Sequence, residues 1–197
     1  MAKKIAVTGG IGSGKSTVIS ILKNMGYSVF SCDEIYGEIL LEEEYIEKVA
    51  KLFPVVVENG QINRKALSEY VFNRETNLVK LNALAHPIIM ERLLSKMEQS
   101  NAEYIFAEVP LLFEGNFENL FDKVLVVMRD IDIRIENVMQ RDALSRQQVK
   151  QRISKQFDYS SREAKKRFKN CNAILLENMG NLEQLNAQVI RLFNSNL

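Results

Sequence analysis

The residues from Gly9 to Ser16 have the types and the spacing that hold a chain of phosphate groups. Gly9 and Gly14 enclose four residues, and Lys15 and Ser16 follow, which is the pattern G-x-x-x-x-G-K-S. In such a loop the backbone N–H groups point at the phosphates, and a side chain on the concave side would block their approach. The lysine reaches the β- and γ-phosphates, and the Ser16 hydroxyl can ligate Mg²⁺. The predicted nucleotide contacts are Gly10, Ile11, Gly12, Ser13, Gly14, Lys15, Ser16 and Thr17.

The segments on either side of this loop agree with it. Residues 3–9, KKIAVTG, are typical of a short buried strand, and residues 15–26, KSTVISILKNMG, have the apolar spacing of a helix that ends before Gly26. The loop therefore precedes a helix N-terminus, where the helix dipole favours anions. The motif predicts that a phosphate chain is held, but it does not name the molecule that receives a phosphoryl group.

Composition narrows the classes of protein that the sequence can encode. A chain of 197 residues suits one domain with insertions or two small domains. The net charge of +1 favours neither nucleic acid nor a membrane as partner, and no apolar run approaches the length of a membrane span. The only two cysteines, Cys32 and Cys171, form no CxxC pair and indicate a reducing compartment, and no signal peptide precedes the first strand. The sequence therefore predicts a soluble cytoplasmic protein.

The chain alternates between short apolar strands and helical stretches, which predicts an α/β fold with a parallel sheet. Ligands of such sheets bind beyond the carboxyl ends of the strands. The residues that deserve most weight are therefore the glycine loop, Ser31–Asp33, Glu108–Pro110 and Arg129. The predicted strands are Ile5–Thr8, Tyr27–Phe30, Ile105–Val109, Val124–Met128 and Ala173–Leu176.

The segment between the second and third strands is too long for one crossover helix and is predicted to form a helical lobe. Residues 42–53 and 64–73 are predicted helices, the second capped by Asn63. A third helix is predicted to begin at Pro87, which is a favourable first helical residue. His86, the only histidine, is then expected to orient the turn before Pro87 and to line the lobe, rather than to act in catalysis.

Residues 141–169 carry ten Lys or Arg residues and only three acidic ones. Ser145 with Gln148, and Ser160 with Glu163, have the spacing of capping boxes, so two short helices are predicted to start there. The basic run could be a solvated helix face, a nucleic-acid patch or a mobile lid that brings arginines onto a polyphosphate. The lid is the favoured interpretation because the run follows a sheet that carries a phosphate loop.

Two carboxylates follow predicted strands. Asp33, just beyond the second strand, could accept the proton of a hydroxyl that attacks the γ-phosphate, although it could also cap the helix that follows. Glu108, at the end of the third, could act near Mg²⁺ or orient a hydroxyl, or it could merely pair with Lys15 or an arginine. The NKxD and DxxG motifs of GTPases are absent, so transfer is favoured over GTP hydrolysis.

The ordered motifs along nearly the whole chain resemble the dephospho-coenzyme A kinase family. The motifs near the ends are TGGIGSGKST and ILLENMG; the first, the phosphate loop, is by itself unspecific among nucleotide-binding proteins, whereas HPII, VPLLFE and QRDALS in this order are much more specific. The motifs between them are SCDEI, INRKAL, AHPII, EVPLLFE, VLVV, QRDALS and ISKQF.

This resemblance implies a P-loop kinase fold with a five-stranded parallel sheet flanked by helices. It implies a nucleotide-binding core (1–35, 101–140 and 170–197), a helical acceptor-binding insert (36–100) and a helical lid (141–169). It also implies ATP and Mg²⁺ as cofactors, with transfer of the γ-phosphoryl group to the ribose 3′-hydroxyl of dephospho-coenzyme A.

The resemblance also implies roles for single residues. Asp33, Lys15 and Arg141 would be catalytic, Asp33 as the base or orienter of the hydroxyl. Arg152 would assist Arg141 on the transferring phosphates, because an arginine fork grips phosphate oxygens in pairs. Asn178 would lie near adenine. The predicted substrate-binding residues are Asp33, Arg64, His86, Glu108, Leu111 and Arg141.

The chain departs from the family pattern at three places. Ser31 replaces a usual Asp, Glu108 replaces an Asp, and Cys171-Asn172 replaces Ala-Asp. The first departure puts more weight on Asp33, and the second leaves the metal geometry around Glu108 open. Two other functions are weighed: a kinase for another acceptor, such as a nucleoside monophosphate, and a non-catalytic protein that binds nucleotides or nucleic acid.

Overall fold

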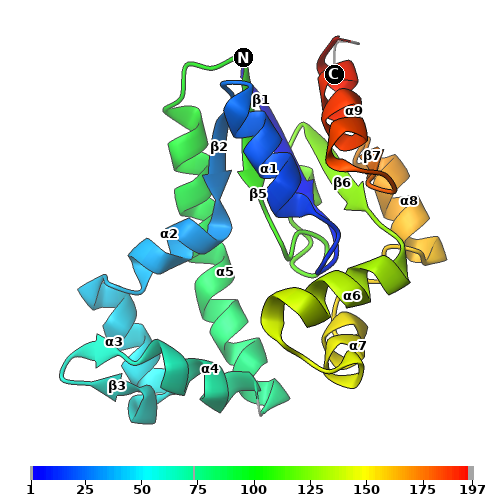
Figure 1. Ribbon diagram of the computed structural model, residues 1–197. Helices are drawn as coiled ribbons and strands as arrows, with labels where there is room; N and C mark the ends of the chain where they lie inside the picture. The colour runs from blue at the N-terminus through cyan, green and yellow to red at the C-terminus, as the bar shows by residue number, and fades with distance from the viewer. Residues whose placement is uncertain (1, 73, 195–197) are drawn as a thin grey trace. The chain divides into compact units, whose positions relative to one another are not determined.

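The computed structural model describes residues 2–72 and 74–194, and Asn73, the last residue of the predicted helix 64–73, lies outside them. Five strands form one sheet in the order β2-β5-β1-β6-β7 (Figure 1), with parallel pairing of β1 to β5 and β6, and of β6 to β7. All five predicted strands are confirmed, with ends shifted by one or two residues. They are β1 (Lys3–Thr8), β2 (Ser28–Ser31), β5 (Tyr104–Glu108), β6 (Lys123–Met128) and β7 (Ile174–Glu177).

Successive side chains of each strand point to opposite faces of the sheet, and both faces are covered. Ile5 and Val7 of β1 point to one face, where Leu125 and Val127 of β6 join them in one hydrophobic cluster. Helices α1 (Lys15–Asn24) and α9 (Leu182–Asn194) close this face with buried aliphatic side chains (Figure 1). Ala6, on the opposite face, is also fully buried. Burial on both faces accounts for the nearly continuous apolar runs of these strands.

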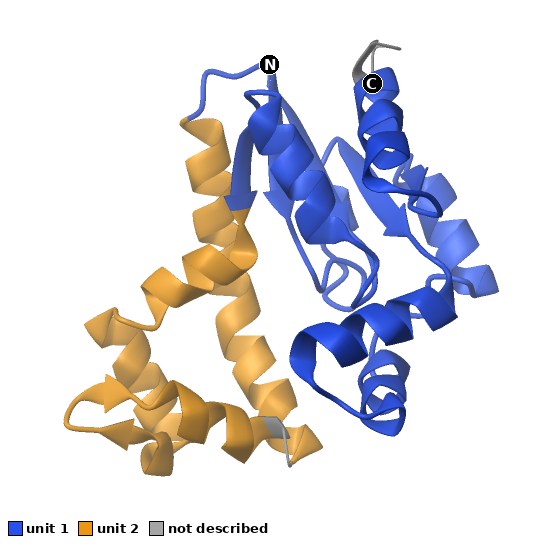
Figure 2. Cartoon of the chain, in the orientation of Figure 1, with its two compact units in different colours: residues 1–30, 100–197 blue, residues 31–99 orange. Residues whose placement is uncertain are grey.

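The contacts divide the chain into two compact units, residues 1–30 with 100–197 and residues 31–99 (Figure 2). The second unit starts at Ser31, because helix α2 begins at Cys32 and packs onto α5. It contains a short antiparallel hairpin, β3 (Val57–Glu58) with β4 (Gln61–Ile62). Its helices are α2 (Cys32–Ile39), α3 (Glu43–Leu52), α4 (Arg64–Phe72) and α5 (Glu75–Glu98).

The predicted helix start at Pro87 is wrong. Pro87 lies inside α5, which begins twelve residues earlier, at Glu75. Leu81 and Ala85 are buried like Met90 and Leu93 further along, so one apolar stripe continues along the helix on both sides of the exposed proline. The burial of that stripe outweighs the backbone hydrogen bond that proline removes. His86 consequently occupies a helix interior and does not orient a turn.

The first unit also contains α6 (Ile131–Asp142), α7 (Arg146–Ser154) and α8 (Arg162–Asn170). The predicted capping box at Ser145 and Gln148 is confirmed, with both reciprocal hydrogen bonds present. The second prediction was one residue off, because Ser161 caps α8 by accepting from the Ala164 N–H. Ser160 instead donates to Asp158 within the preceding turn. Within 2–72 and 74–194, no helix combines the length and apolar character needed to cross a membrane.

Candidate functional site

The phosphate loop connects β1 to α1 as the sequence predicts. Gly9 follows β1 with φ +149°, and a Cβ there would lie 2.4 Å from the Val127 carbonyl oxygen of β6. Gly14 is the N-cap residue of α1 with φ 95°, so the first turn of the helix starts directly where the loop ends. The start of the loop therefore packs against the backbone of β6, and the loop ends at the N-terminus of α1.

Lys15 and Ser16 lie on the first turn of α1, directly after the loop. The Lys15 ammonium donates to the carbonyl oxygens of Gly9 and Gly10, at 2.8 and 3.3 Å. Its side chain thus folds across the concave side of the loop. Ser16 is solvent-exposed. The two side chains that the motif assigns to phosphate and metal are brought to the same turn.

Asn178, on the loop after β7, is buried against the phosphate loop with only 4% of its surface exposed. Its side-chain amide donates to the Ser13 carbonyl at 2.9 Å, and its backbone N–H donates to the Met128 carbonyl at 2.8 Å. A Cβ on Gly14 would lie 2.3 Å from the same amide nitrogen. The described hydrogen bonds of Asn178 are therefore to the backbone of the phosphate loop and to the end of β6.

Three side chains that sequence reasoning missed hold the tip of the loop. Arg134 donates from Nε to the Ile11 carbonyl at 2.9 Å, and Gln156 accepts from the Ile11 N–H at 2.9 Å. Asn137 donates to the Gly12 carbonyl at 3.4 Å. The Ile11 side chain packs on the apolar cluster of α6 and α7 that contains Val138. No motif marks these residues, and only Gln156 belongs to a stretch quoted for the family resemblance.

A buried hydroxyl pair lies where β1 ends. The Tyr159 hydroxyl is 3.2 Å from the Thr8 hydroxyl, and burial raises the pKa of Tyr159 to about 12. Tyr159 belongs to an aromatic cluster with Phe113, Phe157 and Phe168, in which Phe113 and Phe157 stack at 4.8 Å between ring centroids. The cluster fixes the chain from Phe157 onward to the body of this unit.

A buried ion pair adds to this anchor. Arg167 pairs with Glu118 at 2.6 Å and lies 5.1 Å from the Phe113 ring centroid. Glu114 accepts from the Phe157 N–H at 2.8 Å. The second half of the predicted lid segment is therefore held by side-chain contacts as well as by its helix.

The two arginines predicted to act from the lid share one carboxylate. Arg141 forms a bidentate pair with Asp142, with distances of 2.7 and 3.0 Å, and Arg152 contacts the same carboxylate at 3.3 Å. The hydrogen bond lowers the pKa of Asp142 and raises that of Arg141. Both guanidinium groups stay largely exposed. Asp142 thus holds two cations next to each other at the junction of α6 and α7.

Glu108 ends β5 beside β1, opposite Val7 in the strand register. Its side chain is half-buried, and the exposed Leu111 follows in the turn after the strand. Both residues therefore lie at the carboxyl edge of the sheet, the edge at which β1 leads into the phosphate loop.

Asp33 lies in the first turn of α2 and is exposed. The alternative that it caps this helix is wrong, because the N-cap residue is Ser31, whose side chain accepts from the Glu34 N–H. The helix starts one residue after β2, so the cap is the last residue of the strand itself. The carboxylate of Asp33 is therefore not used as the helix cap.

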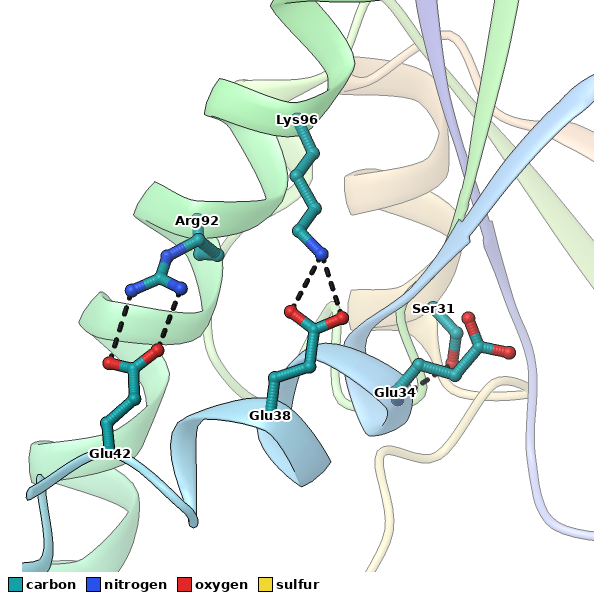
Figure 3. A network of polar contacts seen from close by, with 6 residues as sticks. All are labelled: Ser31, Glu34, Glu38, Glu42, Arg92 and Lys96. Carbon is teal, nitrogen blue, oxygen red and sulfur yellow. Dashed lines mark hydrogen bonds and ion pairs between the residues drawn. The ribbon is translucent and has the colours of Figure 1, made fainter.

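Ion pairs fix the orientation of α2 against α5 in the second unit (Figure 3). Lys96 contacts both carboxylate oxygens of Glu38, at 2.9 and 2.7 Å. Arg92 holds Glu42, just past the end of α2, in a bidentate pair at 2.8 and 3.2 Å. Arg64, at the start of α4, donates to the Gly37 carbonyl of α2 at 2.9 Å. Arg64 therefore contacts the helix that carries Asp33.

His86 is half-buried in α5. Burial lowers its pKa below the ordinary value of 6.5, so the neutral imidazole is the favoured form in the folded chain at neutral pH. Within the described residues, no group of three or more His, Cys, Asp or Glu side chains is arranged to hold a metal ion.

The five-stranded parallel sheet flanked by helices, with a glycine phosphate loop between its first strand and first helix, has the P-loop kinase fold. Shikimate kinase from Acinetobacter baumannii shares this fold at 11% identity, with a TM-score of 0.54 over 100% of this chain and 95% of that one. A family model described as dephospho-CoA kinase matches residues 3–184. The chain belongs to the dephospho-CoA kinase family.

Individual relatives are similar in sequence to this chain over nearly their full length. A dephospho-CoA kinase from Fusobacterium nucleatum subsp. nucleatum is 33% identical and covers 95% of both chains. One from Geobacillus kaustophilus is also 33% identical, over 96% of this chain and 94% of its own. A crystal structure of a Thermus thermophilus protein superposes with a TM-score of 0.81 at 34% identity, over 100% of this chain and 98% of that one. The chain is thus similar to these proteins over nearly its whole length.

Proposed function

We propose that this kinase transfers the γ-phosphoryl group of ATP to the ribose 3′-hydroxyl of dephospho-CoA, giving CoA and ADP. The observation that carries the proposal is the match of residues 3–184 to the family, together with a complete phosphate loop. The partners of the reaction are small molecules, and neither nucleic acid nor a membrane is needed. The expected compartment is the cytoplasm, and the expected state is a monomer or weak homo-oligomer.

The donor half of the site is the loop with the first turn of α1. Residues 10–17 would surround the phosphates with backbone N–H groups, and Lys15 would leave the carbonyls of Gly9 and Gly10 to reach the β- and γ-phosphates. Mg²⁺ usually keeps several waters and takes one or two protein ligands besides the phosphates. The exposed Ser16 hydroxyl fits that need, and the bound ion would neutralise charge on the phosphates. Asn178 would lie near adenine.

The acceptor half is assigned to Asp33, Arg64, His86, Glu108 and Leu111. An exposed carboxylate on the first turn after β2 can orient the attacking hydroxyl and take its proton late in a loose transition state. Arg64 keeps further guanidinium donors for an anionic acceptor beside its bond to Gly37. A neutral His86 could only donate or accept a hydrogen bond, which suits binding rather than proton transfer.

The lid is assigned to residues 141–169. Arg141 would contact the transferring phosphates, with help from Arg152, because guanidinium forks bind phosphate oxygens bidentately. Asp142 holds these two groups side by side, so both would approach the phosphates together. Within this segment, α7 packs on α6 through Val149, and the aromatic cluster anchors the chain from Phe157 onward.

The testing experiment assays the purified chain with ATP, Mg²⁺ and dephospho-CoA, and identifies the product by mass. Asp33→Asn should lower turnover by orders of magnitude while ATP still binds, because the amide keeps the shape but cannot take the proton. Glu34→Gln is the matched control, since Glu34 is an exposed carboxylate in the same helical turn. Turnover of Asp33→Asn near that of the wild type would refute the role of Asp33. Faster phosphorylation of a nucleoside monophosphate than of dephospho-CoA would refute the assignment of dephospho-CoA as the acceptor.

A further inference from the structure

Arg134 of α6 has a position that the phosphate-loop motif does not explain. Its Nε donates to the Ile11 carbonyl at 2.9 Å, across 123 residues of sequence. The side chain is half-buried, and burial lowers its pKa from the ordinary value. A half-buried cation is costly unless it is hydrogen-bonded. The described hydrogen bond of the Arg134 side chain is to the loop backbone.

Gly10 is the second observation that connects Arg134 to the loop. A Cβ on Gly10 would lie 2.1 Å from Nη2 of Arg134 and 3.1 Å from Nη1. The guanidinium therefore occupies the space that a side chain at position 10 would fill. The Gly10 carbonyl also accepts from the Lys15 ammonium at 3.3 Å, so one glycine touches both cations.

Ile11 is fixed on both sides of its backbone. Its N–H donates to Gln156 at 2.9 Å, while its carbonyl accepts from Arg134. With the two peptide groups that flank Ile11 held in this way, the orientation of the adjoining N–H groups is set before any phosphate arrives. Preorganised donors bind an anion more tightly because they need no reordering on binding.

We propose that Arg134 is a positioning residue for the donor nucleotide, which acts through the Ile11 carbonyl to hold the loop in its phosphate-binding shape. The inference rests on the proposed use of ATP but not on the identity of the acceptor. It separates Arg134 from Arg141 and Arg152, which would act on the transferring phosphates themselves. The effect of Arg134 should fall on nucleotide affinity, since the loop shape matters in the ground state as well as in the transition state.

The test is calorimetric titration of Mg·ATP and Mg·ADP into the chain without any acceptor. Arg134→Met keeps the apolar stem and removes the donors, and it should weaken both nucleotides about tenfold or more, as expected for a hydrogen bond from a charged group. Arg134→Lys keeps one charged donor and should recover part of the affinity. Arg191→Met is the matched control, because Arg191 is an exposed arginine near the end of α9.

A merely structural role would lower the urea midpoint of Arg134→Met without changing the nucleotide affinity of the folded protein, and that result would overturn the proposal. Wild-type affinity with a large fall in kcat would also overturn it, since this pattern indicates direct contact with the transition state. A wrong acceptor, by contrast, would leave these titrations unchanged and affect only the proposed function.

A double-mutant cycle keeps the test valid if Arg134→Met folds poorly. Gly10→Ala places a Cβ where the guanidinium lies, so it should harm nucleotide affinity more in the wild type than in an Arg134→Ala background. Strictly additive effects of Gly10→Ala and Arg134→Ala would show that the two residues do not act together, and would contradict the proposal.

Discussion

The side-chain amide of Asn178 donates a 2.9 Å hydrogen bond to the Ser13 carbonyl, although 165 residues separate them in sequence. The bond joins the loop after the last strand of the sheet to the loop after its first strand. The same asparagine bonds the Met128 carbonyl at the end of β6 through its backbone. One residue thus fixes the phosphate loop relative to the carboxyl edge of the sheet.

Asn178→Ala should lower the free energy of unfolding by about 1–3 kcal/mol, because the buried Ser13 carbonyl loses its donor. The KM for ATP should also rise, since the loop loses a support. Urea unfolding and steady-state kinetics measure the two effects. Asn186→Ala, at an exposed position of α9, is the control and should change neither. An unfolding free energy equal to that of the wild type would show that the bond contributes nothing.

Two glycines with positive φ should respond very differently to alanine. Gly9→Ala brings a Cβ to 2.4 Å from the Val127 carbonyl at φ +149°, whereas Gly26→Ala at φ +85° meets nothing within 4 Å. Gly26→Ala should cost about 1–2 kcal/mol of unfolding free energy from the left-handed backbone alone. Gly9→Ala should cost roughly 2–5 kcal/mol, because steric overlap in a packed region adds to the backbone term. Equal urea midpoints for the two variants would contradict this.

His86 should give the chain a pH-dependent stability. Its folded pKa lies below its unfolded value near 6.5, so the unfolded chain binds more protons between these two values. The free energy of unfolding should therefore rise as pH increases towards 6.5 and should lose this contribution to its slope above it. Urea unfolding at pH 5.5 and 7.5 measures the difference.

His86→Gln should make the stability difference between pH 5.5 and pH 7.5 smaller, because His86 is the only histidine in the chain. The remaining difference reports carboxylates, which are the same in both proteins. An unchanged difference between the two pH values would mean that His86 titrates alike in the folded and unfolded chain.

Pro87→Ala should stabilise the second unit by about 1–2 kcal/mol, since it restores a backbone donor inside α5 and removes the proline ring from the preceding turn. Part of the gain is offset because the unfolded chain becomes more flexible. Position 87 is exposed, so no core packing changes. Urea unfolding against the wild type measures the effect, and a decrease in stability would show that α5 requires the bend that proline favours.

Local patterns were sufficient for the sheet and for the phosphate loop. Each strand is a short apolar run between polar residues, and the glycine spacing is tied to one backbone path, so both can be predicted from a few neighbouring residues. Helix ends were harder. Pro87 is a favourable first helical residue, but buried side chains before and after it keep the helix continuous. Ser160 was predicted to cap α8, but its hydroxyl donates to Asp158 instead.

The residues that hold the loop tip could not be predicted from spacing. Arg134 and Gln156 reach Ile11 from positions 123 and 145 residues away, and an isolated arginine in an amphipathic helix has no distinguishing pattern. A run of basic residues, such as 141–169, indicates a candidate phosphate-binding region. It does not predict which of its cations contact the same carboxylate. The sharing of Asp142 by Arg141 and Arg152 depends on the turn between α6 and α7, which folds the chain back.

Ile11 belongs at once to the backbone of the phosphate loop and to the apolar cluster of α6 and α7. A change in the phosphate loop therefore alters the packing free energy of the α6–α7 cluster, and a change in the cluster alters the free energy of the loop. Thermodynamic linkage makes the two effects equal in size. A nucleotide that favours one arrangement of these helices is itself bound more tightly whenever that arrangement is imposed by other means. Ile11 thereby couples nucleotide binding at the phosphate loop to the packing of α6 and α7.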